Sequence, residues 1–322
     1  MKVAILGSRG GWHEARLAEA LRARDVTVAV VPITRLIGRL GTASPRSTRP
    51  SLEVQGERLE ACRAVLVRAI PSGSLEQVIF RVDALHRLTQ LGVDVVNSPR
   101  CLERSVDKFL ASTLLQNAAL PTPRTIACER FEDAMAAFEE LGGDVVVKPL
   151  FGAEGRGMVR LSDGDLAYRT FRALELGRAI FYLQAYLPHG DQDVRAFVVG
   201  DRVVAAMTRY GRDWRTNVSQ GARVEPVELS PGWADLAIRA ARALEADYAG
   251  VDLLPADAGS VFVLEVNGIP GWQGLQRTTE ADVAGVIADH VLQTTRCGPA
   301  AGRGPAIEQA PTTGPIPNGV SR

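Results

Sequence analysis

The stretch Tyr248–Gln273, YAGVDLLPADAGSVFVLEVNGIPGWQ, contains the pattern from which the rest of the chain can be interpreted. Two apolar runs rich in β-forming residues flank a turn of Pro, Asp and Gly residues, which predicts a β-hairpin. A turn centred near Ala258 sets Asp252 opposite Glu265 on the partner strand. The hairpin therefore brings two carboxylates together from two strands.

Successive side chains of a strand point to opposite faces, so Glu265 and Asn267 are expected on one face. Leu264 and Val266 are expected on the other. Three oxygen-bearing side chains, those of Asp252, Glu265 and Asn267, would then meet on one surface. Carboxylates within apolar strands are costly unless they are paired or bound to a metal, and a small set of hard oxygen ligands suits Mg²⁺ shared with phosphate oxygens. An ordinary solvated hairpin edge is the alternative.

The composition is that of a globular protein of 322 residues, with 46% apolar and 23% charged residues, long enough for two or three domains. Basic and acidic residues balance at 37 each, which gives no electrostatic footprint for nucleic acid or an anionic membrane. No apolar run approaches the roughly 20 residues of a membrane helix, and the N-terminus turns polar too soon for a signal peptide. Four cysteines without C-x-x-C spacing argue against zinc and a disulfide framework. We expect a cytoplasmic protein.

The N-terminal part alternates strands and helices. Strands are expected at 2–7, 26–31, 64–67 and 93–96, and helices at 12–24 and 75–91. The first strand, glycine turn and helix are Rossmann-like in outline, but the G-x-G-x-x-G spacing is missing, so an architectural turn is the favoured interpretation. Residues 39–50 are polar and predicted to form a loop. Residues 1–102 are predicted to form an α/β domain, with Arg68 at the carboxyl end of a strand, where open sheets bind ligands.

Two more units and a tail follow. Residues 103–187 are predicted to form an α+β unit, with helices at 103–117, 131–141 and 165–176 and strands at 125–127, 144–149, 158–161 and 180–186. Residues 188–297 are predicted to be strand-rich, with strands at 194–199 and 202–208, a polar stretch at 209–221, a helix at 231–246, the hairpin, and a helix at 280–294. The tail, 298–322, is dominated by Gly, Pro, Ala and Thr and is expected to be disordered.

A glycine loop, defined by Gly152, Gly155 and Gly157, connects two of these strands. Because a strand follows it and not a helix, it fits neither a Walker A loop nor a Rossmann turn. Such a connection can instead fold over phosphates, with its backbone N–H groups donating to them; a flexible turn is the alternative. Lys148 ends the preceding strand, where its ammonium could reach a phosphate.

Lysine is rare in this chain, which contains only Lys2, Lys108 and Lys148. That scarcity gives weight to Lys108, which lies in a predicted helix ahead of the glycine loop. Taken by itself, Lys108 would be interpreted as a surface residue.

Two polar segments are candidates for ligand contact. One ends a strand before a hinge-like Pro-His-Gly and consists of Gln184, Ala185, Tyr186 and Leu187. Its main chain could bond an adenine edge, although a plain interdomain connection fits equally well. The other contains Arg209, Arg215 and Asn217, which could grip phosphate or carboxylate; a solvated loop is the alternative there.

In order and spacing these pieces resemble the ATP-grasp superfamily, and specifically the RimK-like α-L-glutamate ligases, over most of the chain. The matching segments are Val106–Lys108, Val146–Lys148 with the glycine loop, Asp193–Arg195, Arg215–Asn217, Ala249–Asp252, and Leu264–Asn267 followed by Pro270-Gly271. Each motif alone is weak, but six in this order are specific. The resemblance implies an N-terminal Rossmann-like α/β domain followed by two ATP-grasp subdomains that clamp ATP between their sheets.

The resemblance also implies how nucleotide and metal would be held. Lys108 and Lys148 would contact ATP phosphates beneath the glycine loop, and the segment Gln184–Leu187 would receive adenine. Asp193 would bind the ribose. Two Mg²⁺ or Mn²⁺ ions would be held by Asp252, Glu265 and Asn267.

Two arginines are implied as catalytic residues. Arg209 and Arg215 would stabilise charge on the transferred phosphoryl group, and Arg215 and Asn217 would also contact ATP. One departure concerns Ala185, because the family usually has a glutamate there that binds the adenine amino group. Its absence puts strict selectivity for ATP in doubt.

The implied chemistry is acyl activation, in which a carboxylate takes the γ-phosphoryl group and an amine then displaces phosphate to form an amide. Gly73–Gln77 with Phe80-Arg81, and Asn267–Trp272, resemble the ligases that add glutamate to tetrahydromethanopterin-type coenzymes. Arg68 and Trp272 are the candidate acceptor contacts. The alternatives are α-glutamylation of a protein C-terminus and a non-catalytic nucleotide-binding protein. The expected partners are a small-molecule acceptor and L-glutamate, with no nucleic acid or membrane, and we expect a homo-oligomer.

Overall fold

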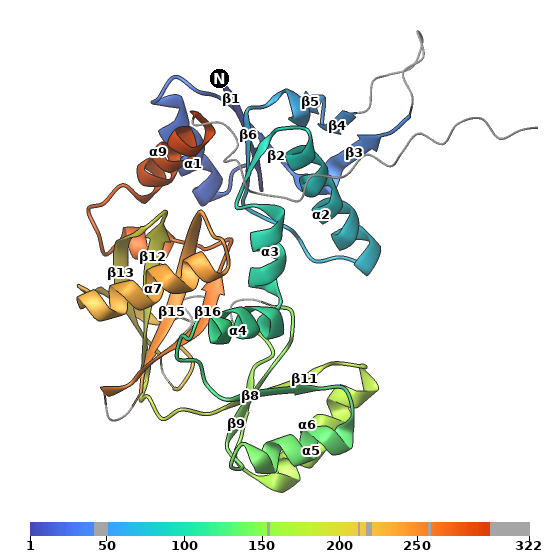
Figure 1. The fold of residues 1–322 in the computed structure, drawn as a ribbon, viewed down its shortest axis with the longest axis vertical. Coiled ribbons are helices and arrows are strands. Elements are labelled where there is room, and N and C mark those ends of the chain that lie inside the picture. Colours follow the sequence, from blue (N-terminus) through green and yellow to red (C-terminus); the bar gives the residue numbers. More distant parts are fainter. Residues whose placement is uncertain (42–50, 153–154, 212, 217–220, 257–258, 297–322) are drawn as a thin grey trace, which may run out of the picture.

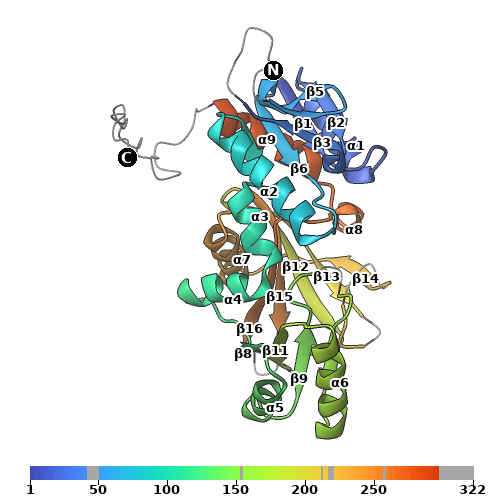
Figure 2. The same cartoon turned by 90° about the vertical axis from the view of Figure 1, so that its right-hand side faces the viewer.

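The computed structural model describes residues 1–41, 51–152, 155–211, 213–216, 221–256 and 259–296. Three units follow one another along the long axis of the molecule (Figures 1 and 2). The N-terminal α/β unit lies at one end, a five-stranded antiparallel sheet lies in the middle, and a four-stranded antiparallel sheet lies at the other end. No helix in the described ranges is long and apolar enough to cross a membrane.

The N-terminal sheet is parallel, with strand order β2-β1-β6-β7. Its strands and flanking helices are β1 (Lys2–Leu6), α1 (Trp12–Arg22), β2 (Thr27–Val31), β6 (Ala64–Val67), α2 (Leu75–Gln90) and β7 (Asp94–Val96). Strands β1 and β6 are almost completely buried, as expected for a parallel sheet covered on both faces. The predicted α/β architecture of this part is confirmed.

A small antiparallel sheet beside it was not predicted. Its strands are β3 (Leu36–Arg39), β4 (Ser51–Val54) and β5 (Glu57–Arg58). The sequence offers little warning of it, since β4 and β5 are separated by only a Gln-Gly turn and β5 has two residues. Most of the loop predicted at 39–50 lies outside the described residues.

The glycine turn after β1 is filled by the chain's own carboxylate. The Ser8 N–H donates to Glu14 Oε1 at 3.2 Å. A Cβ atom placed on Gly7 would lie 2.4 Å from the same oxygen, and one on Gly11 would lie 2.1 Å from Glu14 Oε2. A side chain at either position would have to displace the carboxylate that occupies the turn, which supports the architectural interpretation.

The helix predicted at 103–117 is wrong as a single element. The chain forms α3 (Pro99–Val106) and α4 (Lys108–Asn117), with a break at Asp107. The Asp107 side chain accepts hydrogen bonds from the N–H groups of Phe109 and Leu110 and so caps α4. The break places Lys108 in the first turn of a new helix.

The four-stranded sheet has the order β10-β9-β11-β8. Its elements are β8 (Thr125–Cys128), α5 (Phe131–Glu140), β9 (Val145–Lys148), β10 (Val159–Leu161), α6 (Gly164–Leu176) and β11 (Phe181–Ala185). Helices α5 and α6 cover one face, where Phe138 and Phe171 pack with Val145, Val147 and Leu183. Because side chains alternate, Val146, Lys148 and Gln184 are left for the opposite face.

The five-stranded sheet has the order β14-β13-β12-β15-β16 and contains the hairpin. Its elements are β12 (Gln192–Val199), β13 (Arg202–Tyr210), β14 (Arg223–Pro226), α7 (Pro231–Ala243), β15 (Tyr248–Pro255) and β16 (Val261–Asn267). The predicted pairing of Asp252 with Glu265 is confirmed. The predicted turn near Ala258 lies outside the described residues.

A bulge in this hairpin corrects one expectation. The register shifts after the Asp252–Glu265 pair, so that Leu253 faces Val263 and Leu264 has no opposite residue in the ladder. Leu264 therefore lines the same cavity as Glu265, although strict alternation had assigned it to the other face.

The last described elements, α8 (Gln273–Gln276) and α9 (Val283–Arg296), return to the N-terminal unit. Arg24, in the turn after α1, donates to both carboxylate oxygens of Asp289 in α9, at 2.6 and 2.8 Å. Residues Ile5, Phe197, Trp272 and Ile287 belong to one apolar cluster, so the N-terminal unit and the five-stranded sheet share a core. Helix α9 thus packs against the N-terminal unit as well as against the five-stranded sheet, and the predicted disordered tail, 298–322, lies outside the described residues.

Candidate active site

A cleft of about 850 Å³, counting its open mouth, separates the two antiparallel sheets. One side, the lid wall, consists of β9, β11, the start of α4 and the glycine loop. The other, the base wall, consists of β12, β13, β15 and β16. The predicted site residues that line the cleft are Lys108, Lys148, Gly152, Gly155, Gln184, Ala185, Tyr186, Leu187, Asp193, Arg209, Arg215, Asp252 and Glu265.

Lys148 is the central cation of the lid wall. Its ammonium donates to Gln184 Oε1 at 2.5 Å, and the Gln184 amide in turn donates to Thr125 Oγ1 at 3.2 Å. Burial, together with the nearby charge of Lys108, lowers the pKa of Lys148 to about 8, although Glu265 and Asp252 oppose the shift. Lys148 is therefore a desolvated cation whose contact is a neutral amide.

Lys108 joins α4 to the glycine loop. Its ammonium donates to the Gly152 carbonyl at 2.9 Å, and its backbone N–H donates to the Leu150 carbonyl at 3.4 Å. Burial lowers the pKa of Lys108, against the opposing influence of Glu265 and Asp107. Two lysines distant in sequence thus meet on one wall, each bonded to a neutral oxygen.

The glycine loop connects β9 to β10, as predicted. Gly155 and Gly157 have φ values of +70° and +75°, which favour glycine, and a Cβ on Gly157 would lie 2.9 Å from Pro149 Cγ. Gly157 is not among the residues found lining the cleft. Residues 153–154 lie outside the described part of the loop.

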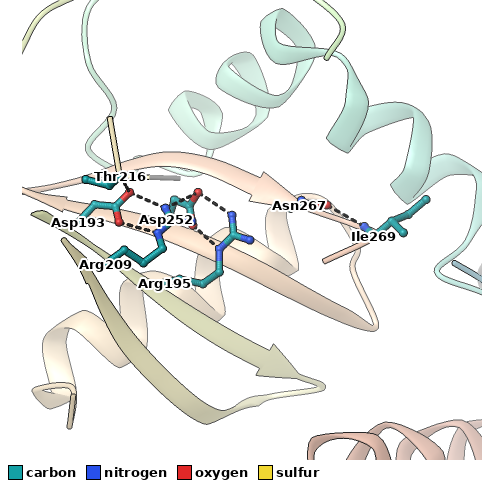
Figure 3. A network of polar contacts seen from close by, with 7 residues as sticks. All are labelled: Asp193, Arg195, Arg209, Thr216, Asp252, Asn267 and Ile269. Atoms are coloured by element: carbon teal, nitrogen blue, oxygen red, sulfur yellow. Dashed lines mark hydrogen bonds and ion pairs between the residues drawn. The ribbon is translucent and has the colours of Figure 1, made fainter. Parts of the chain in front are cut away.

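The base wall carries a buried network of opposite charges (Figure 3). Arg209 donates to both oxygens of Asp193, at 2.7 and 2.5 Å, and also contacts Asp252 Oδ2 at 3.0 Å. Arg195 donates to both oxygens of Asp252, at 2.6 and 2.7 Å. The hydroxyl of Thr216 donates to Asp193 Oδ2 at 2.6 Å. Two carboxylates and two guanidiniums are therefore balanced within one wall.

The network determines the charge states of its members. Burial alone would raise the pKa of Asp252, but Arg195 and Arg209 hold it at about 2. Burial acts against the charged form of Arg209 as well, yet Asp252 and Asp193 raise its pKa. Asp252 and Arg209 therefore stay ionised across the physiological range.

The three predicted metal ligands are only partly brought together. Asp252 and Glu265 both face the cleft, whereas Asn267 is not among its lining residues, and its Oδ1 accepts from the Ile269 N–H at 3.0 Å (Figure 3). The described part of the chain contains no group of three or more His, Cys, Asp or Glu residues that could hold a metal. The two carboxylates that face the cleft nevertheless fit a hard cation that takes its remaining ligands from phosphate oxygens.

Comparison with known proteins agrees with this geometry. The RimK-like ATP-grasp domain model matches residues 105–291, which is more than half of the chain.

The chain belongs to the RimK-like ATP-grasp family.

Two curated relatives of this ATP-grasp protein are named as ligases. The tetrahydromethanopterin:α-L-glutamate ligase of Methanocaldococcus jannaschii is 36% identical over 221 residues, which cover 66% of this chain and 75% of the relative. A probable α-L-glutamate ligase of Cellvibrio japonicus is 32% identical over 309 residues, covering 92% and 99%. The chain is accordingly an ATP-grasp enzyme of the class that forms C–N bonds, and not a non-catalytic binding protein.

The ATP-grasp fold is shared with the solved ligase PsnB. PsnB in complex with a precursor peptide and AMPPNP superposes with a TM-score of 0.69 at 25% identity, covering 91% of this chain and 97% of PsnB. A second PsnB structure, with a phosphomimetic precursor variant, Mg and ADP, gives the same TM-score and identity and covers 98% of PsnB.

In this ATP-grasp chain the segment Gln184–Leu187 lines the cleft but is already partly bonded. The N–H groups of Ala185 and Tyr186 donate to the carbonyls of Arg124 and Asp144. An adenine edge would therefore have to use other main-chain groups of the segment. The Arg160 guanidinium lies 3.4 Å from the centre of the Tyr186 ring and fixes its orientation.

Arg215 reaches from the base wall toward the lid wall. It donates to Asp213 Oδ2 at 3.2 Å and to the Met158 carbonyl at 3.4 Å, and its guanidinium lies 4.5 Å from the Trp214 ring centre. At this position the guanidinium links the two walls. The predicted ATP contact Asn217 lies outside the described residues.

The two candidate acceptor contacts are not at the surface of the cleft. Arg68 is 7% exposed and Trp272 is 1% exposed. Arg68 donates to the Pro270 carbonyl at 2.8 Å and to the Tyr248 hydroxyl at 3.3 Å, and its guanidinium lies 4.6 Å from the Trp272 ring centre. His13 Nε2 accepts from the Trp272 N–H at 3.0 Å. These contacts hold the loop after β16 to the N-terminal unit, and they give the acceptor role no support.

Several residues of this ATP-grasp site were missed. Arg195 and Thr216 belong to the family motifs Asp193–Arg195 and Arg215–Asn217, but the sequence assigns them no function. Their partners, Asp252 and Asp193, lie in other segments of the chain. Asn97 follows β7 and is completely buried. Its amide donates to the carbonyls of Tyr248 and Gly268, both at 2.7 Å, and its Oδ1 accepts from the N–H groups of Asp247 and Tyr248. Asn97 thereby clamps both strands of the hairpin, and no sequence pattern indicated it.

Proposed function

We propose that this enzyme adds L-glutamate to an acceptor carboxylate at the expense of ATP, and that the acceptor is a tetrahydromethanopterin-type coenzyme. The acceptor carboxylate attacks the γ-phosphorus of ATP, which forms an acylphosphate and releases ADP. The amino group of glutamate then attacks the acyl carbon, loses a proton and displaces phosphate. The product is an amide.

The observation that carries the proposal is the opposition of the two walls. Lys108 and Lys148 face the cleft from the lid wall, and Asp252 and Glu265 face it from the base wall. An ATP triphosphate between them would be contacted by the lysines on one side and, through cations, by the carboxylates on the other. In this arrangement residues 103–187 form the lid subdomain and residues 188–297 the base subdomain of the clamp.

We assign Asp252, Glu265 and Asn267 to two Mg²⁺ or Mn²⁺ ions. When bound, such ions neutralise charge that develops on the phosphates. The side chains of this chain do the remaining work: Arg215 stabilises charge on the transferred γ-phosphoryl group, and Arg209, which bonds Asp193 and contacts Asp252, holds both carboxylates in position. Positioning and electrostatic stabilisation supply most of the rate in phosphoryl transfer.

The proposed identity of the acceptor rests on sequence similarity to a named relative. The Methanocaldococcus jannaschii relative, at 36% identity, is named for tetrahydromethanopterin. A second candidate is a peptide or protein C-terminus, which is favoured by the precursor peptide bound to the structural neighbour PsnB. We also propose that the enzyme acts as a homo-oligomer, which light scattering of the purified protein can test.

The deciding experiment measures acceptor-dependent ADP release with Mg-ATP and L-glutamate. One arm supplies tetrahydromethanopterin-type coenzymes, and a second supplies peptides that end in a free carboxylate. Hydroxylamine in place of glutamate should trap the acylphosphate as a hydroxamate. ADP release that responds to no pterin would remove the coenzyme proposal, and a response to peptides would replace it by the second candidate.

A further inference from the structure

Arg195 lies at the edge of the buried network on the base wall. Its side chain is 14% exposed, whereas that of Arg209 is 4% exposed. Arg209 is held by two carboxylates, Asp193 and Asp252. Within the described residues, the ion pairs of Arg195 go to Asp252 alone. Of the two arginines, Arg195 is therefore the one that can leave Asp252 with less disruption.

The metal-free site needs a cation at Asp252. This carboxylate is 5% exposed, and a buried carboxylate without a partner is strongly destabilising. Arg195 supplies the cation through two hydrogen bonds from the neighbouring strand, where it is the residue opposite Asp252 in the ladder. The four charges of Asp193, Asp252, Arg195 and Arg209 then sum to zero.

A divalent cation at Asp252 would upset this balance. It would add two positive charges beside two guanidiniums that already compensate the carboxylates, and like charges at such separations repel. The repulsion falls if one guanidinium withdraws or if phosphate charges arrive with the metal. A site built in this way favours a metal that comes together with a nucleotide over a metal alone.

On one side Arg195 packs against backbone. Its side chain runs beside Gly250 of β15, where an added Cβ would lie 3.5 Å from Arg195 Cδ and Cζ and 3.1 Å from Pro270 Cβ. The guanidinium therefore passes over a residue that has no side chain. Releasing Asp252 breaks the two hydrogen bonds that this carboxylate accepts from Arg195.

We propose that Arg195 is a positioning residue that substitutes for the metal, holding Asp252 in place until a divalent cation binds and then giving up its two-bond contact. The proposal rests on the role of Asp252 as a metal ligand, and it needs neither glutamate nor an acceptor. Arg195 and the metal are competitors for one carboxylate. Metal binding and release of the guanidinium are coupled.

The first test measures Mn²⁺ binding to the full chain without nucleotide by electron paramagnetic resonance. In Arg195→Gln the competitor is gone, and we expect binding about tenfold tighter or more than in the wild type. Arg24→Gln is the matched control, because Arg24 makes the same two-bond contact with Asp289 far from the cleft. It should bind Mn²⁺ as the wild type does. Folded Arg195→Gln with unchanged or weaker binding would overturn the proposal.

Thermal unfolding supplies a readout other than metal affinity. Without metal, Arg195→Gln should melt at a lower temperature than the wild type, because Asp252 has lost one of its two cations. Saturating Mn²⁺ should raise the melting temperature of the variant by more than it raises that of the wild type. An equal rise in both proteins would contradict competition.

A second test uses the wild type alone and therefore does not depend on whether a variant folds. Nitrogen-15 NMR resolves arginine Nε–Hε groups that are held in hydrogen bonds. Titration with Mg-ADP should shift or broaden the Arg195 Nε–Hε signal and leave that of Arg24 unmoved. A signal of Arg195 that stays in place at saturation would overturn the exchange. Because no acceptor is present, this outcome is independent of whether the proposed glutamate ligation is found.

Discussion

The two walls of the cleft solve the problem of buried charge differently. On the base wall, the carboxylates of Asp193 and Asp252 are matched by Arg195 and Arg209 at hydrogen-bond distance. On the lid wall, the ammonium of Lys148 donates to the neutral amide oxygen of Gln184 at 2.5 Å, and among described residues this is its one hydrogen bond. On the base wall Asp193 and Asp252 are therefore compensated without a ligand while Glu265 faces the cleft, and on the lid wall the ammonium of Lys148 bonds to a neutral group.

The pKa values of the two walls show the same contrast. The arginines hold the pKa of Asp252 at about 2, below its usual range. Burial, aided by the charge of Lys108, lowers the pKa of Lys148 to about 8, because the opposing charges of Glu265 and Asp252 are too weak to offset the desolvation. The base wall is therefore preorganised, while the lid wall gains its missing counter-charge only when an anion binds. A triphosphate is an anion of the right kind.

The largest expected effect is on the rate of ADP release, when the carboxylate of the base wall that faces the ligand is neutralised. Glu265→Gln should lower the rate of ADP release by about a hundredfold to a thousandfold, since two unit charges about 4 Å apart interact by about 4 kcal/mol at an effective dielectric near 20. Steady-state kinetics checks this. Glu225→Gln, in β14 of the same sheet with a side chain that is 47% exposed, is the control. Near-normal turnover in Glu265→Gln would contradict the role of the base wall.

The next largest effect concerns the hydrogen bonds that hold the hairpin of the base wall to the N-terminal unit. Asn97→Ala removes four buried hydrogen bonds that clamp β15 and β16 to the N-terminal unit, and the free energy of unfolding should fall by about 3 kcal/mol. Urea unfolding measures the change, with Asn117→Ala at the exposed end of α4 as the control. A change below about 1 kcal/mol would show that packing alone holds the hairpin.

A pH dependence separates the walls. A bound phosphate favours the charged form of Lys148, so its pKa in the complex lies above the value of about 8 in the free protein. The affinity for ATP should be constant below about pH 8 and fall by up to about tenfold per pH unit above it. Lys148→Arg stays charged and should remove the dependence. The expected fall corresponds to ~1.4 kcal/mol of binding free energy per pH unit. A wild-type affinity that stays constant up to about pH 9.5 would mean that Lys148 already has a counter-charge in the free protein.

The smallest effect concerns nucleotide choice at the end of the lid wall. Ala185→Glu introduces the glutamate usual in the family and should raise the preference for ATP over GTP by about fivefold, the equivalent of one hydrogen bond of about 1 kcal/mol. Dissociation constants for the two nucleotides measure it. If selectivity is already high in the wild type and does not change, other groups of the segment read the base.

The sequence by itself determined the β-hairpin and its central pair. A short turn between two β-branched runs leaves little freedom of register, so Asp252 had to face Glu265, and the bulge at Leu264 changed only what lies beyond that pair. The glycine loop between two strands and the family also followed from local spacing. Local chemistry determines such features because turns, strand alternation and motif order are properties of neighbouring residues.

Only the tertiary structure decided what each charge faces. Asp252 lies 57 residues from Arg195 in sequence, and Asp193 lies 16 residues from Arg209, yet sheet pairing makes them neighbours. Asn97 reaches the hairpin across 151 and 171 residues, and Arg68 and Trp272, proposed as acceptor contacts, are buried against each other. Hydrogen bonds and ion pairs act over a few ångströms in space, and strand order, which no local pattern encodes, determines which side chains come within that distance.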